Sequence, residues 1–176
     1  MAAQEISGAF WDNIEWNLQL VVAQMAHAKE VKTRARSGYY KIAFFLSASI
    51  IEALVHQLLR DRLDTLPANQ IPFMDWECSD FDELAKKYCL NHIKLAICKR
   101  RHPRFELTSR TDFKTVNDKC LELGVFNNAL FVKIEKIRIL RNKVHLQGQD
   151  RASRRWARSD VKSCLGVGEK LIQKLN

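Results

Sequence analysis

Two charged residues four positions apart, Arg141 and His145, are the strongest candidates for chemistry in this sequence. Their segment has apolar residues at helical spacing, and a wheel of about 100° per residue places both on its apolar side, with Arg138 at the edge. Burying such cations is unfavourable unless each is paired or borders a cleft that admits water or an anion. The segment therefore predicts either an internal ion pair or a polar cleft that acts on a phosphate.

One reaction at a phosphate that these residue types would suit is metal-independent cleavage of RNA. The RNA 2′-hydroxyl attacks the adjacent phosphate, which requires a base, an acid for the leaving oxygen and a nearby positive charge. His145 suits proton transfer because an imidazole changes its charge near pH 7. Arg141 or Arg138 suits the phosphate because a guanidinium stays protonated and holds two oxygens at once. Asn142 can position His145 or the substrate through a hydrogen bond.

No cofactor and no metal are expected. The sequence has no glycine-rich phosphate loop, dinucleotide fingerprint, nucleophile elbow or carboxylate cluster suited to Mg²⁺. Cys89 and His92 with Cys98 and His102 could be drawn as a zinc site, but no second close cysteine pair supports it. The five cysteines are an odd number without a repeated short spacing, which favours small core residues in a reducing cytoplasm.

The elements that must position these residues are helices. Apolar residues recur three and four positions apart along the chain, and capping residues and glycines mark the ends of these segments. This pattern predicts an all-α, up-and-down bundle of about five to six helices. Strand signals are few. The first expected helix spans 10–36, and after a break at Ser37–Gly38 the second spans 39–63. The next three span 79–101, 111 or 112 to 124, and 127 or 128 to 148. The last helix is capped by Ser159 and runs to residue 175.

Helix 39–63 is apolar around most of its circumference and belongs at the centre of the bundle. Glu52 and His56 form a polar pair on it, four residues apart. Two arrangements are open: either they face solvent through a gap, or Glu52 pairs with Arg138 or Arg141 and orients the guanidinium from behind.

The charge of the chain is uneven. Residues 1–90 hold 9 Lys/Arg against 12 Asp/Glu, and residues 91–176 hold 20 against 8. A basic half indicates a polyanion such as RNA, although an acidic partner protein would also fit. Trp156 stands among arginines, which suits either base stacking on RNA or a linker with a docked tryptophan. The candidate RNA-binding residues are Arg100, Arg101, Arg104, Lys143, Arg154 and Arg155.

Length and hydropathy predict one domain, 1–176, with a single core. Residues 1–9 lack the basic start and apolar core of a signal peptide. The longest apolar stretch, 42–59, is interrupted by Ser47, Ser49, Glu52, His56 and Gln57. We therefore expect a buried helix, no membrane association and a cytoplasmic location.

Arg141-Asn142-Lys143-Val144-His145 resembles the signature of the HEPN superfamily, in which an Arg followed by Asn, Asp or His precedes a His near the end of a long helix. The resemblance extends over roughly residues 8–175, including the helix that carries Glu52. The family leaves four to six residues between Arg and His. Here Arg141 and His145 enclose three and Arg138 and His145 enclose six, so both arginines are candidates.

The resemblance implies a HEPN-like helical fold and a homodimer whose composite cleft joins two Arg/His sets. It also implies a toxin–antitoxin or phage-defence role, with RNA as substrate and an antitoxin protein as a possible partner. A competing hypothesis is a non-catalytic helical module whose Arg and His lock a core or a dimer interface. A third, also from the family, is a partner subunit of a nucleotidyltransferase.

Overall fold

The structure is a computed structural model that describes residues 7–67, 69–71, 105–146 and 155–175, and for residues 33 and 143–146 the backbone alone. The chain divides into two compact units. The first unit consists of Met1–Thr65 together with Ser109–Asn176, and the second consists of Leu66–Thr108. In the second unit the Gln70 amide donates to the Pro67 carbonyl at 2.8 Å, and the Phe105 side chain is buried. The expected helix 79–101 lies outside the described residues, so the single-domain expectation stays a prediction.

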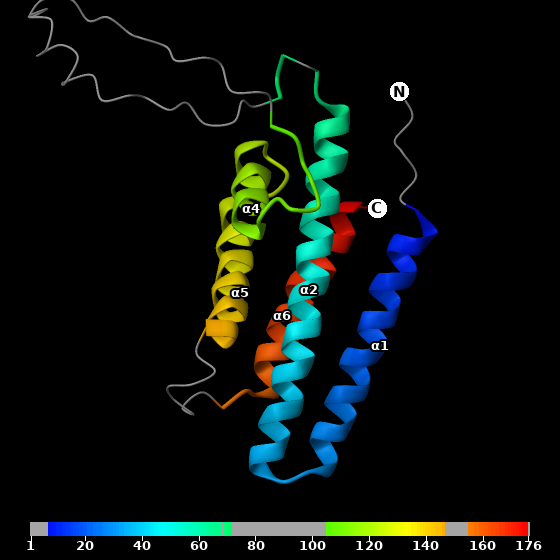
Figure 1. Cartoon of the computed structure of the whole chain (residues 1–176), viewed down its shortest axis with the longest axis vertical. Helices are drawn as coiled ribbons and strands as arrows, with labels where there is room; N and C mark the ends of the chain where they lie inside the picture. Colours follow the sequence, from blue (N-terminus) through cyan, green and yellow to red (C-terminus); the bar gives the residue numbers. More distant parts are fainter. Residues whose placement is uncertain (1–6, 68, 72–104, 147–154, 176) are drawn as a thin grey trace, which may run out of the picture. The chain divides into compact units, whose positions relative to one another are not determined.

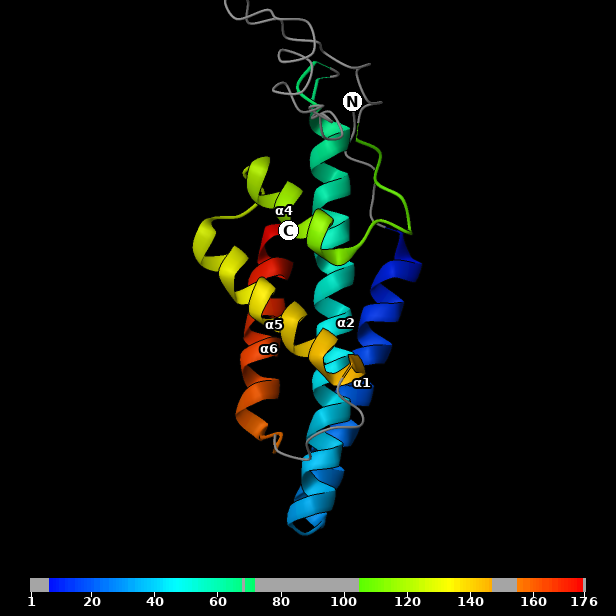
Figure 2. The same cartoon turned by 60° about the vertical axis from the view of Figure 1, so that its left-hand side comes forward.

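The first unit is an all-α bundle, which confirms the predicted fold class. Over the described residues the chain forms five helices and no strand (Figures 1 and 2). Their bounds are α1 Gly8–Glu30, α2 Thr33–Thr65, α4 Phe113–Glu122, α5 Asn128–Leu146 and α6 Arg158–Leu175.

Helix α2 is the central element, as its apolar circumference predicted. It contacts α1, α4, α5 and α6, and its residues Phe44, Ile51, Leu54, Val55 and Leu59 are almost completely buried. By length and composition the stretch Arg34–Thr65 could cross a membrane, a test that the core helix of a soluble protein also passes. Of the most apolar 18-residue window in this stretch, 56% is buried inside the bundle.

The turn between α1 and α2 lies earlier than predicted. Helix α1 ends at Glu30, the chain reverses at Val31–Lys32, and α2 continues through Ser37 and Gly38. The expected break at Ser37–Gly38 was wrong. A glycine inside a helix costs only about 1 kcal/mol, and the Ser37 hydroxyl accepts a hydrogen bond from the Trp156 amide at 2.8 Å, a tertiary contact that the local pattern does not contain.

The starts of α4 and α5 follow the predicted capping residues. The Asp112 carboxylate accepts hydrogen bonds from the Thr115 amide at 3.1 Å and the Thr115 hydroxyl at 2.6 Å, and these bonds lower the pKa of Asp112. The Asn127 side chain accepts from the Leu130 amide at 3.0 Å at the start of α5. Gly124 has a positive φ of 66° after α4, so the predicted glycine stop is confirmed.

Helix α6 is anchored through Trp156, which lies two positions before its first residue. The Trp156 side chain is buried, with its ring centroid 4.7 Å from that of Phe44 on α2. Of the two interpretations of Trp156, the structure confirms the docked tryptophan. Helix α6 begins at Arg158, and the Asp160 carboxylate accepts from the Ala157 amide at 2.9 Å. Ser159 lies inside the first turn, so the prediction that it caps α6 was wrong.

Candidate functional site

Helix α5 presents its arginines beside its buried face. Leu130, Ile134 and Ile137 are buried, as their spacing predicted, while Arg138 and Arg141 are half-buried at the edge. The helix runs back toward the end of the bundle at which α2 begins (Figures 1 and 2). This direction brings the last turns of α5 alongside the middle of α2.

Arg141 and Glu52 form an ion pair between α5 and α2. The Arg141 Nη1 atom lies 2.8 Å from the Glu52 Oε2 atom, and each side chain is 26% exposed. The alternative in which Glu52 meets one of the two arginines is therefore confirmed, and Arg141 is that arginine. Within the described part of the chain, Glu52 is the only residue with which the Arg141 side chain is seen to pair. A guanidinium has five N–H donors, so this contact leaves most of them for a further ligand.

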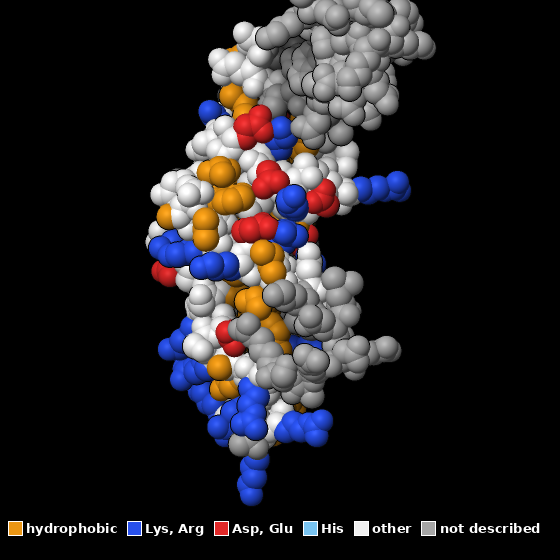
Figure 3. All heavy atoms as spheres, turned by 90° about the vertical axis from the view of Figure 1, so that its left-hand side faces the viewer, with side chains coloured by type: hydrophobic (Ala, Val, Ile, Leu, Met, Phe, Trp, Pro, Cys, Tyr) orange, Lys and Arg blue, Asp and Glu red, His pale blue; other side chains and the backbone are white. Residues whose placement is uncertain are grey.

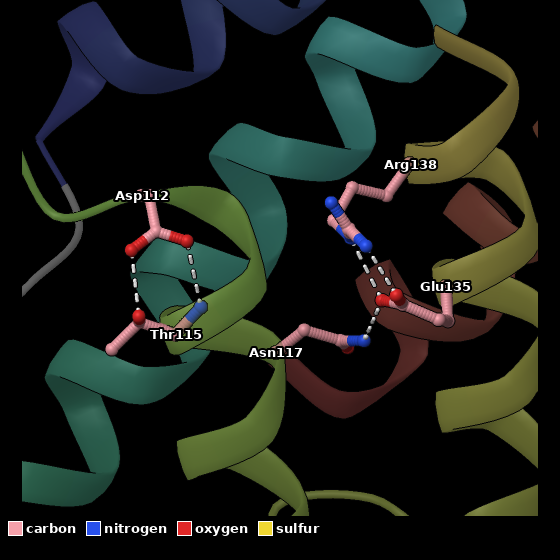
Figure 4. A network of polar contacts seen from close by, with 5 residues as sticks. All are labelled: Asp112, Thr115, Asn117, Glu135 and Arg138. Carbon is pink, nitrogen blue, oxygen red and sulfur yellow. Dashed lines mark hydrogen bonds and ion pairs between the residues drawn. The ribbon is translucent and has the colours of Figure 1, made fainter. Parts of the chain in front are cut away.

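Arg138 is held by a different carboxylate. Its Nε atom donates to Glu135 Oε2 at 2.9 Å, and its Nη2 atom donates to Glu135 Oε1, so the pair is bidentate (Figure 4). The hydrogen bond raises the pKa of Arg138 and lowers that of Glu135. Arg138 pairs with Glu135 on its own helix, whereas Glu52 pairs with Arg141, so the alternative in which Arg138 meets Glu52 was wrong.

A third residue closes this network. The buried Asn117 on α4 donates through Nδ2 to Glu135 Oε2 at 3.3 Å, so Glu135 links α4 to α5 (Figure 4). Neither Asn117 nor Glu135 was identified from the sequence. The spacing of Glu135 and Arg138, three apart on a helix, was the signal that could have identified the pair.

His56 lies one turn from Glu52 on α2 and is half-buried. Burial lowers the pKa of His56, and the positive charge of Arg60 acts in the same direction, against the opposing effect of the Glu52 carboxylate. The imidazole therefore favours its neutral form. His56, Glu52 and Arg141 form a polar cluster on one side of the central helix.

The remaining predicted site residues are placed as follows. His145 and Lys143 belong to the last turn of α5, where the structure describes the backbone alone. Asn142 and Arg155 are exposed. Arg100, Arg101, Arg104 and Arg154 lie outside the described residues, as do Cys89, His92, Cys98 and His102.

The described side chains do not gather into a metal site. Across the described ranges, no group of three or more His, Cys, Asp or Glu side chains is placed to hold a metal ion. Cys120 and Cys164 are buried in the core, and burial raises the pKa of each thiol to about 12. Both behave as small apolar residues, as expected.

A separate groove with a volume of about 560 Å³ lies among α1, α2 and α6. Its lining is mostly apolar, with Leu18 from α1, Ile50 and Ile51 from α2, and Leu165 and Ile172 from α6. None of its lining residues belongs to the Glu52–Arg141 cluster.

Comparison of the chain with protein-family models, with curated proteins and with solved structures gives no match. The resemblance to the HEPN superfamily therefore stays a prediction from the sequence.

Proposed function

We propose that the protein is a metal-independent endoribonuclease whose site is built on the last turns of α5. The observation that carries this proposal is the Glu52–Arg141 pair. The carboxylate fixes the guanidinium from one side, and most N–H donors of Arg141 remain for a phosphate. His145 follows one helical turn later.

In the proposed reaction the RNA 2′-oxygen forms a bond to phosphorus and the bond to the 5′-oxygen breaks. The products are a 2′,3′-cyclic phosphate and a 5′-hydroxyl end. One group removes the proton of the 2′-hydroxyl and another supplies a proton to the leaving 5′-oxygen. The Arg141 guanidinium stabilises the negative charge that develops on the phosphate. Asn142 is proposed to orient the substrate.

A single imidazole does not serve easily as base and acid at one phosphate in the same step. A homodimer that brings two copies of the α5 end together would supply the second His145. This arrangement belongs to the proposal, as do a toxin or phage-defence role, a cytoplasmic location and an antitoxin partner.

The test uses purified protein, short single-stranded RNA and EDTA. We expect the wild type to produce cyclic phosphate ends, and His145→Ala to lower the rate by about 100-fold or more. The matched control is His27→Ala, because His27 is an exposed histidine on α1, where its contacts are Glu30 at 3.8 Å and the Tyr39 ring at 5.7 Å. Equal inertness of the wild type and His145→Ala would eliminate the nuclease.

A second candidate is a non-catalytic helical module. The observation that favours it is that both arginines are ion-paired within the chain, Arg138 with Glu135 and Arg141 with Glu52. In this case the charges fix the packing of α5, and the partner could be an antitoxin or a nucleotidyltransferase. RNA in EDTA would then remain intact while Glu52→Ala still destabilised the fold.

A further inference from the structure

The end of the bundle at which α1 turns into α2 carries a dense set of exposed cations. We call this set the basic end, and it consists of Lys29, Lys32, Arg34, Arg36, Arg155 and Arg158. In Figure 3, blue side chains gather at the lower end of the view, whereas red and blue side chains mix higher up. The two halves of the set are more than a hundred positions apart in sequence.

The docking of Trp156 brings these two halves together. The Trp156 amide donates to the Ser37 hydroxyl at 2.8 Å, and the Trp156 ring packs on Phe44. Arg155 precedes Trp156 and Arg36 precedes Ser37, so both arginines flank the same hydrogen bond. The first turns of α2 and α6 begin at this end and add two partly positive helix N-termini, of which the partly negative C-terminus of α1 offsets one.

Within the described part of the chain, the cations of the basic end are not paired with acidic side chains. Among the described residues, none of its six side chains forms a salt bridge with a carboxylate. The Arg36 Nε atom donates only to the Val31 carbonyl at 3.1 Å. Of the nearby acids, Glu30 lies 3.8 Å from His27, and the Asp160 carboxylate accepts from the Ala157 amide. Such a cluster of unpaired cations attracts a polyanion.

The basic end continues along α2 toward the proposed site. On a wheel of about 100° per residue, Arg34 has the same direction as Glu52, and Lys41 differs from it by about 20°. At about 1.5 Å per residue, Arg34 and Glu52 are separated by about 27 Å along α2. A stacked nucleic-acid strand places about eight phosphates along such a length, at about 3.4 Å each.

From this arrangement we infer that the basic end binds the phosphate backbone of single-stranded RNA and guides it along Arg34 and Lys41 to Arg141. This inference rests on the proposed function for the choice of RNA among polyanions. The contacts are to phosphates, so binding is expected to depend on salt and little on base sequence.

The experiment measures RNA binding apart from cleavage, by fluorescence anisotropy in the His145→Ala background. Arg34→Glu with Arg158→Glu reverses two charges of the basic end. The matched control is Lys170→Glu with Lys174→Glu, which makes the same charge change on exposed residues at the other end of α6. At each salt concentration between about 50 and 200 mM, we expect the first variant to have a Kd about tenfold or more above that of the His145→Ala protein. The control should change Kd less than about threefold.

The salt dependence gives a second readout. Each lost phosphate contact lowers the slope of log Kd against log salt by about 0.7 for a single strand. We expect the basic-end variant to lose about one to two contacts and the control to lose none. Arg34→Gln with Arg158→Gln, which removes charge without reversing it, should show a smaller effect in the same direction. Circular dichroism of each variant confirms that the helices remain folded.

Equal weakening by the basic-end variant and the control would overturn the inference, because only net charge would then matter. Unchanged binding in both would also overturn it. Binding to vesicles containing phosphatidylserine, without binding to RNA, would assign the basic end to a membrane surface and overturn it as well. Failure of cleavage alone, with RNA bound through the basic end, would refute the nuclease and leave this inference standing.

Discussion

The Arg141 Nη1 atom lies 2.8 Å from the Glu52 Oε2 atom, and this contact joins the last turns of α5 to the centre of α2. Both side chains are partly exposed, so solvent screens the pair without removing it. Arg141 is thus oriented by the core helix of the bundle and still accessible from outside.

The first prediction concerns the strength of this pair. In a double-mutant cycle of Glu52→Gln and Arg141→Met, we expect a coupling free energy of about 1 kcal/mol, because the charges are in contact and partly desolvated. Chemical denaturation of the four proteins measures it. The control cycle combines Glu52→Gln with Arg138→Met and should give no coupling, since Arg138 pairs with Glu135. Coupling in the control cycle without coupling in the first would show that the pairing has been assigned to the wrong arginine.

The second prediction separates the roles of the two arginines. Arg141→Ala should lower RNA cleavage by about 100-fold, because it removes charge beside the phosphate. Arg138→Ala should leave cleavage within about threefold and destabilise the fold by about 1 kcal/mol, because Glu135 loses its bidentate partner. The pKa of Glu135, followed by NMR, should rise toward its ordinary value. A large loss of cleavage in Arg138→Ala with a stable fold would transfer the catalytic role to Arg138.

The third prediction concerns pH. The pKa of His56 is lowered in the folded state, chiefly by burial, so the unfolded chain binds more protons between the folded value and about 6.5. The stability that the neutral imidazole contributes is therefore complete above about pH 6.5 and decreases as the pH falls through that value. Urea denaturation at about pH 7.5 and 5.5 measures how much the free energy of unfolding falls between these pH values. This decrease should be smaller for His56→Gln than for the wild type. An equal loss in both proteins would mean that His56 does not contribute.

The fourth prediction compares two glycines. Gly124 has a φ of 66°, so Gly124→Ala should destabilise the protein by about 1 kcal/mol or more, although a Cβ there would meet no atom within 4 Å. Gly166 lies inside α6 and has similar open space, so Gly166→Ala should stabilise it by about 0.5–1 kcal/mol. Thermal unfolding measures both. Changes of the same sign would contradict the assigned backbone conformations.

The sequence was sufficient for features that depend on neighbouring residues. The apolar spacing along α2 and α5 identified the core faces, and Asp112, Asn127 and Gly124 marked the ends of helices, because capping acts within a few residues. The sequence also placed Arg141 on the apolar side of α5 and Arg138 at its edge, where each cation needed either a partner or a cleft.

Only the tertiary structure decided which partner each cation has. Glu52 is 89 positions from Arg141 in the sequence, and its choice of Arg141 depends on how α5 approaches α2. The same holds for Trp156, whose contacts with Ser37 and Phe44 join the segment before α6 to the first turns of α2. The sequence determines the helices and the faces that they bury, because these follow from local spacing. The pairing of charges across helices is decided by packing, because the separation of two side chains depends on how whole helices meet.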